Sequence, residues 1–259
     1  MNILFTICGR AGSKGITGKN TQMFCGKPLV YYTIAAYTLC REYNTKDCIH
    51  LAVNTDSELL KKQIEQTGVE YFFIPRKESL AGDVVSKKDV IKDTLLECER
   101  MQNLSYDILV DLDITSPIRT AEDIMKTIDI LNHNFDADIV YTVVESRRSP
   151  YFNMVSKKED GYYTTVLKSQ YVARQQAPVC YDMNASIYVY RRKYVLEGQM
   201  FERKALISVM DDTGVLDIDS SDDLELMQII AEYLFANKIK YQNIVERVRG
   251  YEWDREHQQ

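Results

Sequence analysis

The sequence predicts an α/β fold in which helices cover both faces of a mostly parallel β-sheet. Short apolar runs alternate with helical stretches of ten or more residues over most of the chain, a pattern typical of βαβ units. Right-handed crossovers between parallel strands place helices on both faces, which gives three layers. The 259 residues, 45% of them hydrophobic and 27% charged, are enough for one large domain with a full core.

Strands and helices alternate regularly over the first 144 residues. Pro28 opens the first expected helix, because proline is favoured in a first helical turn, and Ser57 is expected to cap the second. The expected strands cover residues 3–8, 49–53, 69–74, 108–112 and 137–144. The expected helices cover residues 29–43, 57–66, 86–101 and 120–131. In such sheets the ligand sits at the carboxyl ends of the strands, so the loops there are the candidate site.

The alternation stops between residues 145 and 182, where polar and proline-containing segments separate short apolar stretches. This region predicts an arm with a hairpin of short strands. The α/β domain is then expected to consist of residues 1–144 and 183–240. We expect residues 241–259, which include the single tryptophan, to form a peripheral tail.

Within the second part of the α/β domain the sheet is expected to resume at residues 186–190. A strand-like stretch at 216–218 then leads into a last helix over residues 221–235.

Charge is distributed unevenly along the chain. The net charge of −6 makes nucleic acid a poor candidate partner. The first 41 residues hold five Lys and Arg but no Asp or Glu, whereas residues 211–225 hold seven acidic residues and no basic one. A basic segment without carboxylates in an acidic protein indicates a polyanionic ligand, and the acidic segment is suited to its counter-cation.

The composition also bears on location. No apolar run approaches the roughly 20 residues that span a bilayer, and the first residues lack the basic region and cleavage site of a signal peptide. We therefore expect no membrane partner and a cytoplasmic protein. The six cysteines are scattered without a CxxC pair, which favours reduced thiols over a disulfide framework or a zinc site.

A glycine-rich basic loop follows the first expected strand directly. Residues 9–20, with the sequence GRAGSKGITGKN, contain four glycines and three basic side chains. Glycines let the backbone approach a ligand closely, and backbone N–H groups combined with cations form a phosphate site. The loop is not a Walker A motif, because Asn20 follows Lys19, and it is not a Rossmann fingerprint, because Ala11 replaces the second glycine. We interpret it as a phosphate-binding loop of another kind, with a solvated surface turn as the alternative.

This loop resembles the nucleotide-binding signature A-R-x-G-S-K-G-x-x-x-K-N of the CMP-sialic acid synthetase family, with Gly9 in place of the first alanine. Further segments match the family's motifs in order: N-T-D at 54–56, L-A-G-D at 80–83, T-S-P-I-R-T at 115–120, R-Q-Q-A-P at 174–178, N-A-S-I-Y at 184–188 and D-I-D at 217–219. The resemblance spans residues 3–230. Within the family, the segments 150–153 and 180–188 look closest to CMP-legionaminic acid synthetases.

The resemblance implies a Rossmann-like nucleotidyltransferase fold and a homodimer formed through the arm. It implies transfer of CMP from CTP to the anomeric hydroxyl of an acidic nine-carbon sugar, with release of pyrophosphate. The acceptor it favours is N,N'-diacetyllegionaminic acid, with sialic and pseudaminic acids as alternatives. Such a reaction depends mainly on positioning and charge neutralisation. A catalytically silent nucleotide-binding homologue is the alternative from another class.

The resemblance also assigns roles to individual residues. Lys19 and Arg10 would be catalytic. The nucleotide site would consist of Arg10, Ala11, Gly12, Ser13, Lys14, Lys19, Asn20, Arg76, Ala81, Asp83 and Ser86. The sugar site would consist of Asp113, Thr115, Ser116, Arg174, Gln175, Gln176, Asn184 and Tyr188. In the resembling family this arm forms the dimer contact, and a basic residue from the partner subunit reaches the sugar. Arg174 lies in the arm and would take that role; the alternative is that Arg174 is a surface arginine without a role at the site.

Asp217 and Asp219 are the expected ligands of Mg²⁺ or Mn²⁺. Their alternation on an expected strand would direct both carboxylates to the same side, and magnesium prefers oxygen ligands. The alternative is that Asp219 or Ser220 only caps the following helix. Asp113 stands where sialic acid enzymes have glutamine, and it could accept hydrogen bonds from the sugar or serve as a further metal ligand.

Overall fold

The computed structural model describes residues 1–12, 15–82, 85–197, 203–211 and 217–253. The strands of its main sheet are β1 (Asn2–Gly9), β4 (Cys48–Thr55), β5 (Phe72–Pro75), β6 (Ile108–Leu112), β7 (Ile139–Glu145), β10 (Tyr181–Arg191) and β11 (Ala205–Val209). Two small sheets pair β2 (Met23–Phe24) with β3 (Lys27–Pro28) and β8 (Val155–Lys157) with β9 (Tyr163–Thr165). The α-helices are α1 (Val30–Tyr43), α2 (Glu58–Glu65), α3 (Lys87–Gln102), α4 (Ala121–Asn132), α5 (Arg192–Glu197), α6 (Ser221–Asn237) and α7 (Gln242–Gly250).

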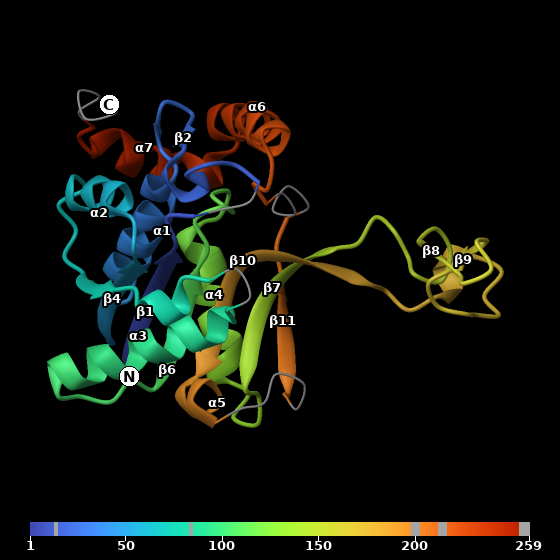
Figure 1. Cartoon of the computed structure of the whole chain (residues 1–259), viewed down its shortest axis with the longest axis horizontal. Coiled ribbons are helices and arrows are strands. Elements are labelled where there is room, and N and C mark those ends of the chain that lie inside the picture. The colour runs from blue at the N-terminus through green and yellow to red at the C-terminus, as the bar shows by residue number, and fades with distance from the viewer. Residues whose placement is uncertain (13–14, 83–84, 198–202, 212–216, 254–259) are drawn as a thin grey trace.

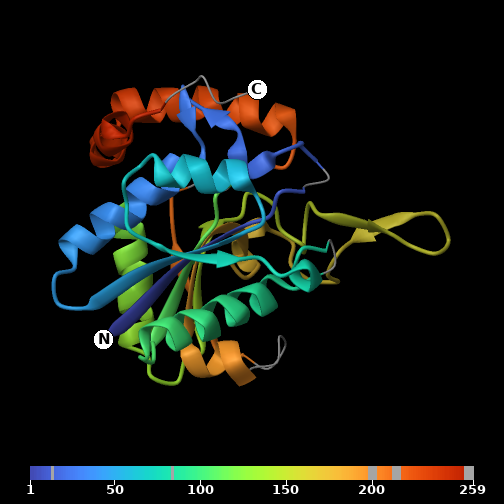
Figure 2. The ribbon, with the colours of Figure 1, turned by 60° about the vertical axis from the view of Figure 1, so that its left-hand side comes forward.

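Within the described residues, the main sheet has seven strands in the order β11-β7-β10-β6-β1-β4-β5. Neighbouring strands are parallel except at β10, which runs antiparallel to both β6 and β7. Figures 1 and 2 show helices on both faces of this sheet. The predicted three-layer α/β class with a mostly parallel sheet is therefore confirmed.

Each face of the sheet buries a core of its own. On one face, α1, α2, α4, α6 and α7 enclose the larger hydrophobic cluster, which includes Phe5 and Ile34. On the other face, α3 and α5 cover a smaller cluster around Leu4 and Ile91. The neighbours Leu4 and Phe5 lie in different clusters because successive strand side chains point to opposite faces. This double burial explains why β1 is apolar throughout.

Hydroxyl side chains cap the helices where the sequence predicted helix starts. Ser57 accepts a hydrogen bond from the backbone of α2, and Ser86 does so for α3. Thr120 forms a capping box at the start of α4, and Ser220 forms one at the start of α6. Because α3 and α6 begin at these caps, their first turns are held beside the ends of the central strands.

Several elements differ from the prediction. Pro28 lies in β3 and pairs with Met23, so α1 begins two residues later, at Val30. The sheet also contains the edge strand β11, and the short helix α5 follows β10; neither was predicted. The five-residue β11 and six-residue α5 are too short to display a clear hydrophobic period.

The expected peripheral tail is partly wrong. Helix α7 packs on α1, and Ile244, Val248 and Tyr251 belong to the larger core cluster. The Tyr251 ring lies 5.4 Å from the Tyr31 ring in an edge-to-face arrangement. The prediction failed because α7 is too short to give a clear hydrophobic pattern in the sequence. Its apolar face is buried by packing on α1, which is distant in the sequence.

Residues 146–180 leave the sheet between β7 and β10 and carry the β8–β9 hairpin far from the domain (Figure 1). The predicted arm with a hairpin of short strands is thus present. Large apolar side chains on it are exposed, among them Val155, Tyr162, Tyr163 and Val172.

Candidate active site

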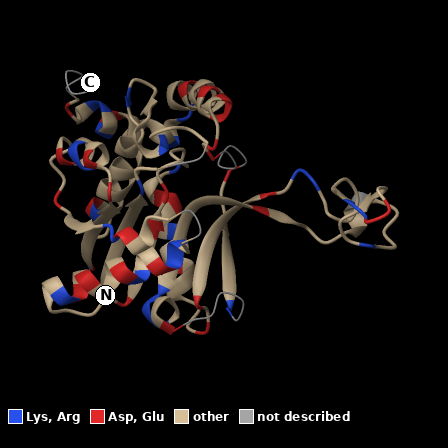
Figure 3. Cartoon of the chain, viewed as in Figure 1, with Lys and Arg blue, Asp and Glu red and all other residues tan. Residues whose placement is uncertain are grey.

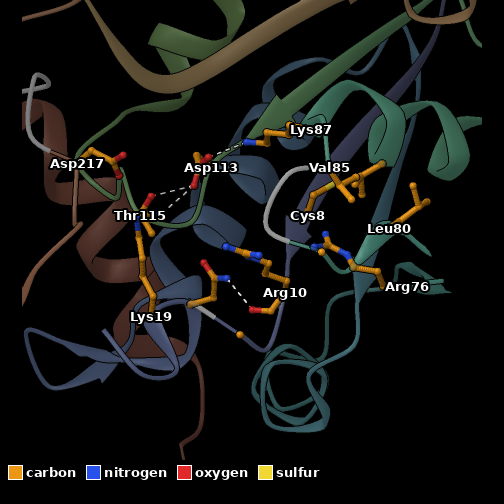
Figure 4. A pocket seen from close by; sticks show the side chains of 14 residues that line it. Cys8, Arg10, Lys19, Arg76, Leu80, Val85, Lys87, Asp113, Thr115 and Asp217 are labelled. Carbon is orange, nitrogen blue, oxygen red and sulfur yellow. Dashed lines mark hydrogen bonds and ion pairs between the residues drawn. The ribbon is translucent and has the colours of Figure 1, made fainter. Parts of the chain in front are cut away.

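A cavity of about 310 Å³ opens at the carboxyl ends of β1, β5 and β6 (Figure 4). This is the edge at which α/β sheets bind ligands. Four basic and two acidic side chains face it, so the cavity is suited to a polyanion. It is lined by Cys8, Arg10, Gly12, Lys19, Asn20, Arg76, Leu80, Gly82, Val85, Lys87, Val90, Asp113, Thr115 and Asp217.

The loop after β1 meets the acidic segment at the start of α6. Lys19 Nζ lies 2.6 Å from Asp219 Oδ1, although 200 positions separate the two residues. A Cβ atom on Gly15 would lie 2.1 Å from the Asp219 carbonyl oxygen, so only glycine permits this close approach. Figure 3 shows the acid-rich start of α6 in its place above the sheet. The fold therefore brings together the two oppositely charged segments that the sequence singled out.

Hydrogen bonds hold the basic loop against neighbouring strand ends. Asn20 Nδ2 donates to the Arg10 carbonyl oxygen at 3.1 Å, which ties the two ends of the loop together. The Ala11 amide donates to Asp56 Oδ1 at 2.7 Å, just beyond β4. Arg10, Gly12 and Asn20 line the cavity, whereas the Ala11 backbone anchors the loop.

Arg76 enters the cavity from the end of β5. Its Nε donates to Asn54 Oδ1 at 2.9 Å, and its NH2 group donates to the Asn54 carbonyl oxygen at 3.1 Å. Asn54 is fully buried and donates in turn to Thr94 on α3. Burial lowers the pKa of Arg76 from its ordinary value, but a guanidinium remains charged at neutral pH. Arg76 is therefore a fixed cation opposite Lys19 in Figure 4.

Asp217 faces the cavity beside Lys19, but its segment differs from the prediction. Residues 217–219 are not in a strand; instead, the Ile218 amide donates to the Thr115 carbonyl oxygen at 3.1 Å. Burial raises the pKa of Asp217, and the neighbouring Asp113 carboxylate acts in the same direction. Within the described residues, Asp217 Oδ1 is buried without a hydrogen-bond partner. This oxygen is thus available to a ligand.

Ser220, and not the Asp219 side chain, caps helix α6. Ser220 accepts a hydrogen bond from the Asp223 amide at 3.1 Å, and the Asp223 carboxylate accepts from the Ser220 amide at 2.7 Å. The Asp219 carboxylate, with 76% of the side chain exposed, pairs with Lys19. The helix start is therefore satisfied without it.

Asp113 lies at the inner end of the cavity, beyond the end of β6. Thr115 donates to its Oδ1 through the hydroxyl at 2.9 Å and the amide at 3.2 Å. Lys87 Nζ donates to its Oδ2 at 2.6 Å. Burial favours the neutral acid, yet the Lys87 ammonium holds the pKa of Asp113 well below its ordinary value. Asp113 is therefore an ionised hydrogen-bond acceptor facing the cavity.

Two functional positions were missed by the sequence analysis. Lys87, in the first turn of α3, lines the cavity; no spacing distinguished it from the adjacent Lys88. Arg119 was read only as part of the T-S-P-I-R-T motif, but it is 1% exposed. It donates to the carbonyl oxygens of Asp113, Ser116 and Ser186. A buried arginine thus holds the loop after β6 against β10.

The expected sugar residues do not gather in one place. Asp113 and Thr115 line the cavity. Ser116 and Asn184 are buried: the Ser116 hydroxyl donates to the Asn184 carbonyl oxygen, and the Asn184 side chain accepts from Thr142. In this chain these two residues hold the irregular part of β10 against its neighbours.

The remaining expected sugar residues lie behind the cavity or in the arm. Tyr188 stacks on Tyr190 behind Lys87, whose ammonium lies 5.8 Å from the Tyr188 ring centre. Gln175 and Gln176 are exposed in the arm, and Gln176 accepts hydrogen bonds from the backbone at Val172 and Ala173. The side chain of Arg174 lies outside the described part of the structure.

The expected nucleotide residues are only partly described. Ser13, Lys14 and Asp83 lie outside the described residues. Ala81 lies next to Leu80 and Gly82, which line the cavity. Ser86 caps α3 through a hydrogen bond from Lys88, which places Lys87 at the cavity wall.

Comparison with known proteins is consistent with this geometry. The profile of the family described as "Cytidylyltransferase" matches residues 4–240. A Campylobacter coli protein named "Post-translational flagellin modification protein B" is 34% identical over 229 residues, 88% of this chain and 94% of the relative. A Campylobacter jejuni protein named "CMP-N,N'-diacetyllegionaminic acid synthase" is 35% identical over 236 residues, 88% and 94% of the two chains.

A solved structure shares the fold. It is titled as CMP:2-keto-3-deoxy-manno-octonic acid synthetase complexed with CTP, and it matches with a TM-score of 0.62 at 14% identity. The match covers 90% of this chain and 99% of that one. With a family profile that covers nearly all of the chain, this protein belongs to the cytidylyltransferase family.

Proposed function

We propose that the enzyme transfers CMP from CTP to the anomeric hydroxyl of an acidic nine-carbon sugar. The observation that carries the proposal is the cavity in which Arg10, Lys19 and Arg76 face Asp217. Three cations opposite a carboxylate suit a triphosphate and its divalent counter-ion. The name of the Campylobacter jejuni relative favours N,N'-diacetyllegionaminic acid as the acceptor sugar.

The reaction is a displacement at the α-phosphorus of CTP. A bond forms between the sugar's anomeric oxygen and the α-phosphorus, while the bond from this phosphorus to the bridging oxygen breaks. Pyrophosphate takes the electron pair, and the hydroxyl proton passes to solvent. Lys19 and Arg10 neutralise the charge that develops on the phosphate oxygens, which is the main catalytic demand of such a step.

Mg²⁺ or Mn²⁺ would be held by Asp217 and Asp219 together with oxygens of the substrate. The donor set fits such an ion, because Asp217 Oδ1 has no hydrogen-bond partner within the described residues, and both side chains supply hard oxygen ligands. No group of three or more His, Cys, Asp or Glu ligands occurs among the described residues, so the ion would take its other ligands from water and phosphate oxygens. When bound, the ion would neutralise charge on the triphosphate.

The sugar site is proposed to span two subunits. Asp113 and Thr115 would hydrogen-bond the sugar from the inner end of the cavity. Arg174, Gln175 and Gln176 would reach a sugar bound in the partner subunit, since they lie in the arm. An exposed arm with several large apolar side chains is suited to pack against a second copy of the chain. We therefore propose a homodimer.

We also propose that the reaction takes place in the cytoplasm, where CTP is made. Among the described residues, the helices are too short or too polar to cross a membrane.

The test is pyrophosphate release by the purified protein with CTP, Mg²⁺ and single nonulosonic acids. N,N'-diacetyllegionaminic acid should give the highest kcat/KM, ahead of N-acetylneuraminic and pseudaminic acids. UTP in place of CTP is the nucleotide control. A preference for another nonulosonic acid would replace the acceptor assignment, and an absence of turnover with all three sugars would favour the silent homologue.

A further inference from the structure

A cluster of one lysine and two aspartates lies at the inner wall of the cavity, and it includes Asp113, the carboxylate proposed to bind the sugar. Lys87 Nζ lies 2.6 Å from Asp113 Oδ2 and 2.8 Å from Asp111 Oδ2. Asp111 is in β6 and Asp113 lies just after it, so the two carboxylates share one face of the strand. The ammonium comes from α3, which packs on β1 and β4.

Asp111 depends on this lysine for its charge balance. It is fully buried, and its Oδ1 accepts a hydrogen bond from the Thr6 hydroxyl at 2.8 Å. Its Oδ2 lies 2.8 Å from the Lys87 ammonium and accepts no other hydrogen bond within the described residues, so this ammonium is what offsets its charge. A buried carboxylate without a nearby cation is strongly unfavourable.

The same geometry would suit a divalent ion. Two carboxylate oxygens converge on one point, at distances only slightly longer than the roughly 2.0–2.6 Å that Mg²⁺ or Ca²⁺ ligands adopt. The ammonium occupies that point. Thr115 holds the other oxygen of Asp113 from the opposite side, so the carboxylate cannot turn away from Lys87 without losing hydrogen bonds.

We propose that Lys87 is a built-in counter-cation: it occupies the position between Asp111 and Asp113 that a divalent ion would otherwise take. Lys87 is therefore a positioning residue. It confines the catalytic ion to the Asp217 end of the cavity and reserves Asp113 as an acceptor for donor groups of the sugar. The assignment of Asp113 to the sugar rests on the proposed function, whereas the exclusion of the ion does not.

The experiment counts Mn²⁺ ions bound per chain by electron paramagnetic resonance, without nucleotide or sugar. Lys87→Met removes the charge and keeps much of the side-chain volume; it should bind one Mn²⁺ more than the unaltered protein. The double variant Lys87→Met/Asp113→Asn should lose that additional ion. Lys88→Met is the matched control, because Lys88 lies beside Lys87 but its ammonium rests over the Tyr194 ring. It should bind as many ions as the unaltered protein.

Thermal unfolding provides a second measurement, because Lys87→Met leaves two facing carboxylates. Its Tm should fall by about 5–10 °C without metal, and Mn²⁺ should restore most of that loss. If Lys87→Met folds only in the presence of Mn²⁺, the inference is supported. The conservative variant Lys87→Arg should fold and bind no additional ion.

The inference is overturned if Lys87→Met binds the same number of Mn²⁺ ions as the unaltered protein, or if Mn²⁺ stabilises both equally. It is also overturned if Lys87→Arg gains an ion. These outcomes do not depend on turnover. A failure of the proposed function would instead appear as absent pyrophosphate release by the unaltered protein.

Where turnover is measured, Lys87→Met should raise the KM for the sugar about tenfold or more. The KM for CTP should change much less, because Arg10, Lys19 and Arg76 are untouched. An equal rise of both KM values would contradict the assignment of Asp113 to the sugar.

Discussion

The cavity at the strand ends and the arm are built on opposite principles. At the cavity, polar side chains are oriented by buried partners, as Asn54 orients Arg76 and Thr115 orients Asp113. In the arm, the hairpin strands β8 and β9 pair with each other, and Tyr162 and Tyr163 are 75% and 66% exposed. The cations of the first region are held in place by the chain's own buried residues, whereas the second region carries large apolar side chains that are exposed.

This difference predicts that the nucleotide and the sugar are bound by different parts of the assembly. Triphosphate recognition needs fixed cations, and the single chain already holds them in place. Gln175 and Gln176, proposed above to bind the sugar, are exposed in the arm, and Gln176 is held by the backbone of the arm itself, at Val172 and Ala173. Preorganised groups act without reorganisation at the moment of reaction, so we expect nucleotide binding to be a property of the monomer and sugar turnover a property of the dimer.

The largest expected effect comes from Lys19→Ala. Loss of one preorganised donor to the developing phosphate charge should lower kcat/KM about 10²–10³-fold. The Tm should change little, because the Lys19–Asp219 pair is largely exposed on the aspartate side. Pyrophosphate release and thermal unfolding measure the two quantities. Lys77→Ala, which removes an ion-paired surface lysine outside the cavity, is the control; equal activity of the two variants would refute the role of Lys19.

The next largest effect tests whether the buried Arg119 side chain holds the loop after β6 in place. Arg119→Met removes the buried guanidinium that donates to the carbonyl oxygens of Asp113, Ser116 and Ser186. We expect a loss of about 3–5 kcal/mol in the free energy of unfolding, measured in urea. Arg100→Met is the control, because that side chain is 74% exposed and should cost under about 0.5 kcal/mol. Similar values for both variants would mean that Arg119 does not hold the loop.

A third effect should appear only in assembly. Replacing Tyr162 and Tyr163 with Asp should raise the dimer Kd by about 30-fold or more, since a buried interface aromatic contributes about 2 kcal/mol. Analytical ultracentrifugation measures the Kd. CTP binding to the monomer should be retained. Phe135→Asp, at a site 87% exposed on the main domain, is the control, and an unchanged Kd in the arm variant would place the interface elsewhere.

The smallest effect concerns a charge pair at the other end of the sheet. Burial opposes the charge on Glu99, but hydrogen bonds from Arg192 and the Tyr106 amide lower the pKa of Glu99 below its ordinary 4.5. A carboxyl group with a lowered pKa stabilises the fold above its ordinary pKa, and that contribution is lost as pH falls through the folded value. Glu99→Gln should cost about 1–2 kcal/mol at pH 7 and almost nothing once the pH has fallen below the folded pKa of Glu99.

Unfolding in urea across this pH range measures the loss. Asp160→Asn, at an exposed turn in the arm, is the control. The side-chain oxygen of the introduced asparagine can still accept the hydrogen bond that the Tyr162 backbone amide donates to Asp160. Its cost should stay below about 0.5 kcal/mol at every pH. A pH-independent cost for Glu99→Gln would show that packing, not charge, explains the effect.

Local patterns were enough to predict most of the fold. A few consecutive residues were enough to predict each of three features: the apolar strand β1, the helix starts capped by Ser57 and Thr120, and the polar arm. Helix α7 and strand β11 were not predicted in this way, because each is short and becomes stable only against neighbours distant in the sequence. The antiparallel direction of β10 likewise arises because the chain returns from the arm into the sheet. No local hydrophobic pattern predicts this direction.

The same division holds at the site. The sequence by itself determined the fold class, because apolar runs alternate with helical stretches. It also located the two charged segments, because glycine, lysine and aspartate in these segments already restrict the chemistry. Only the tertiary structure decided that Lys19 meets Asp219, that Asn184 is buried, and that Lys87 stands between two carboxylates. Such pairings depend on which helix packs against which strand end, and they are set by the burial of the whole core, not by the residues that form the pair.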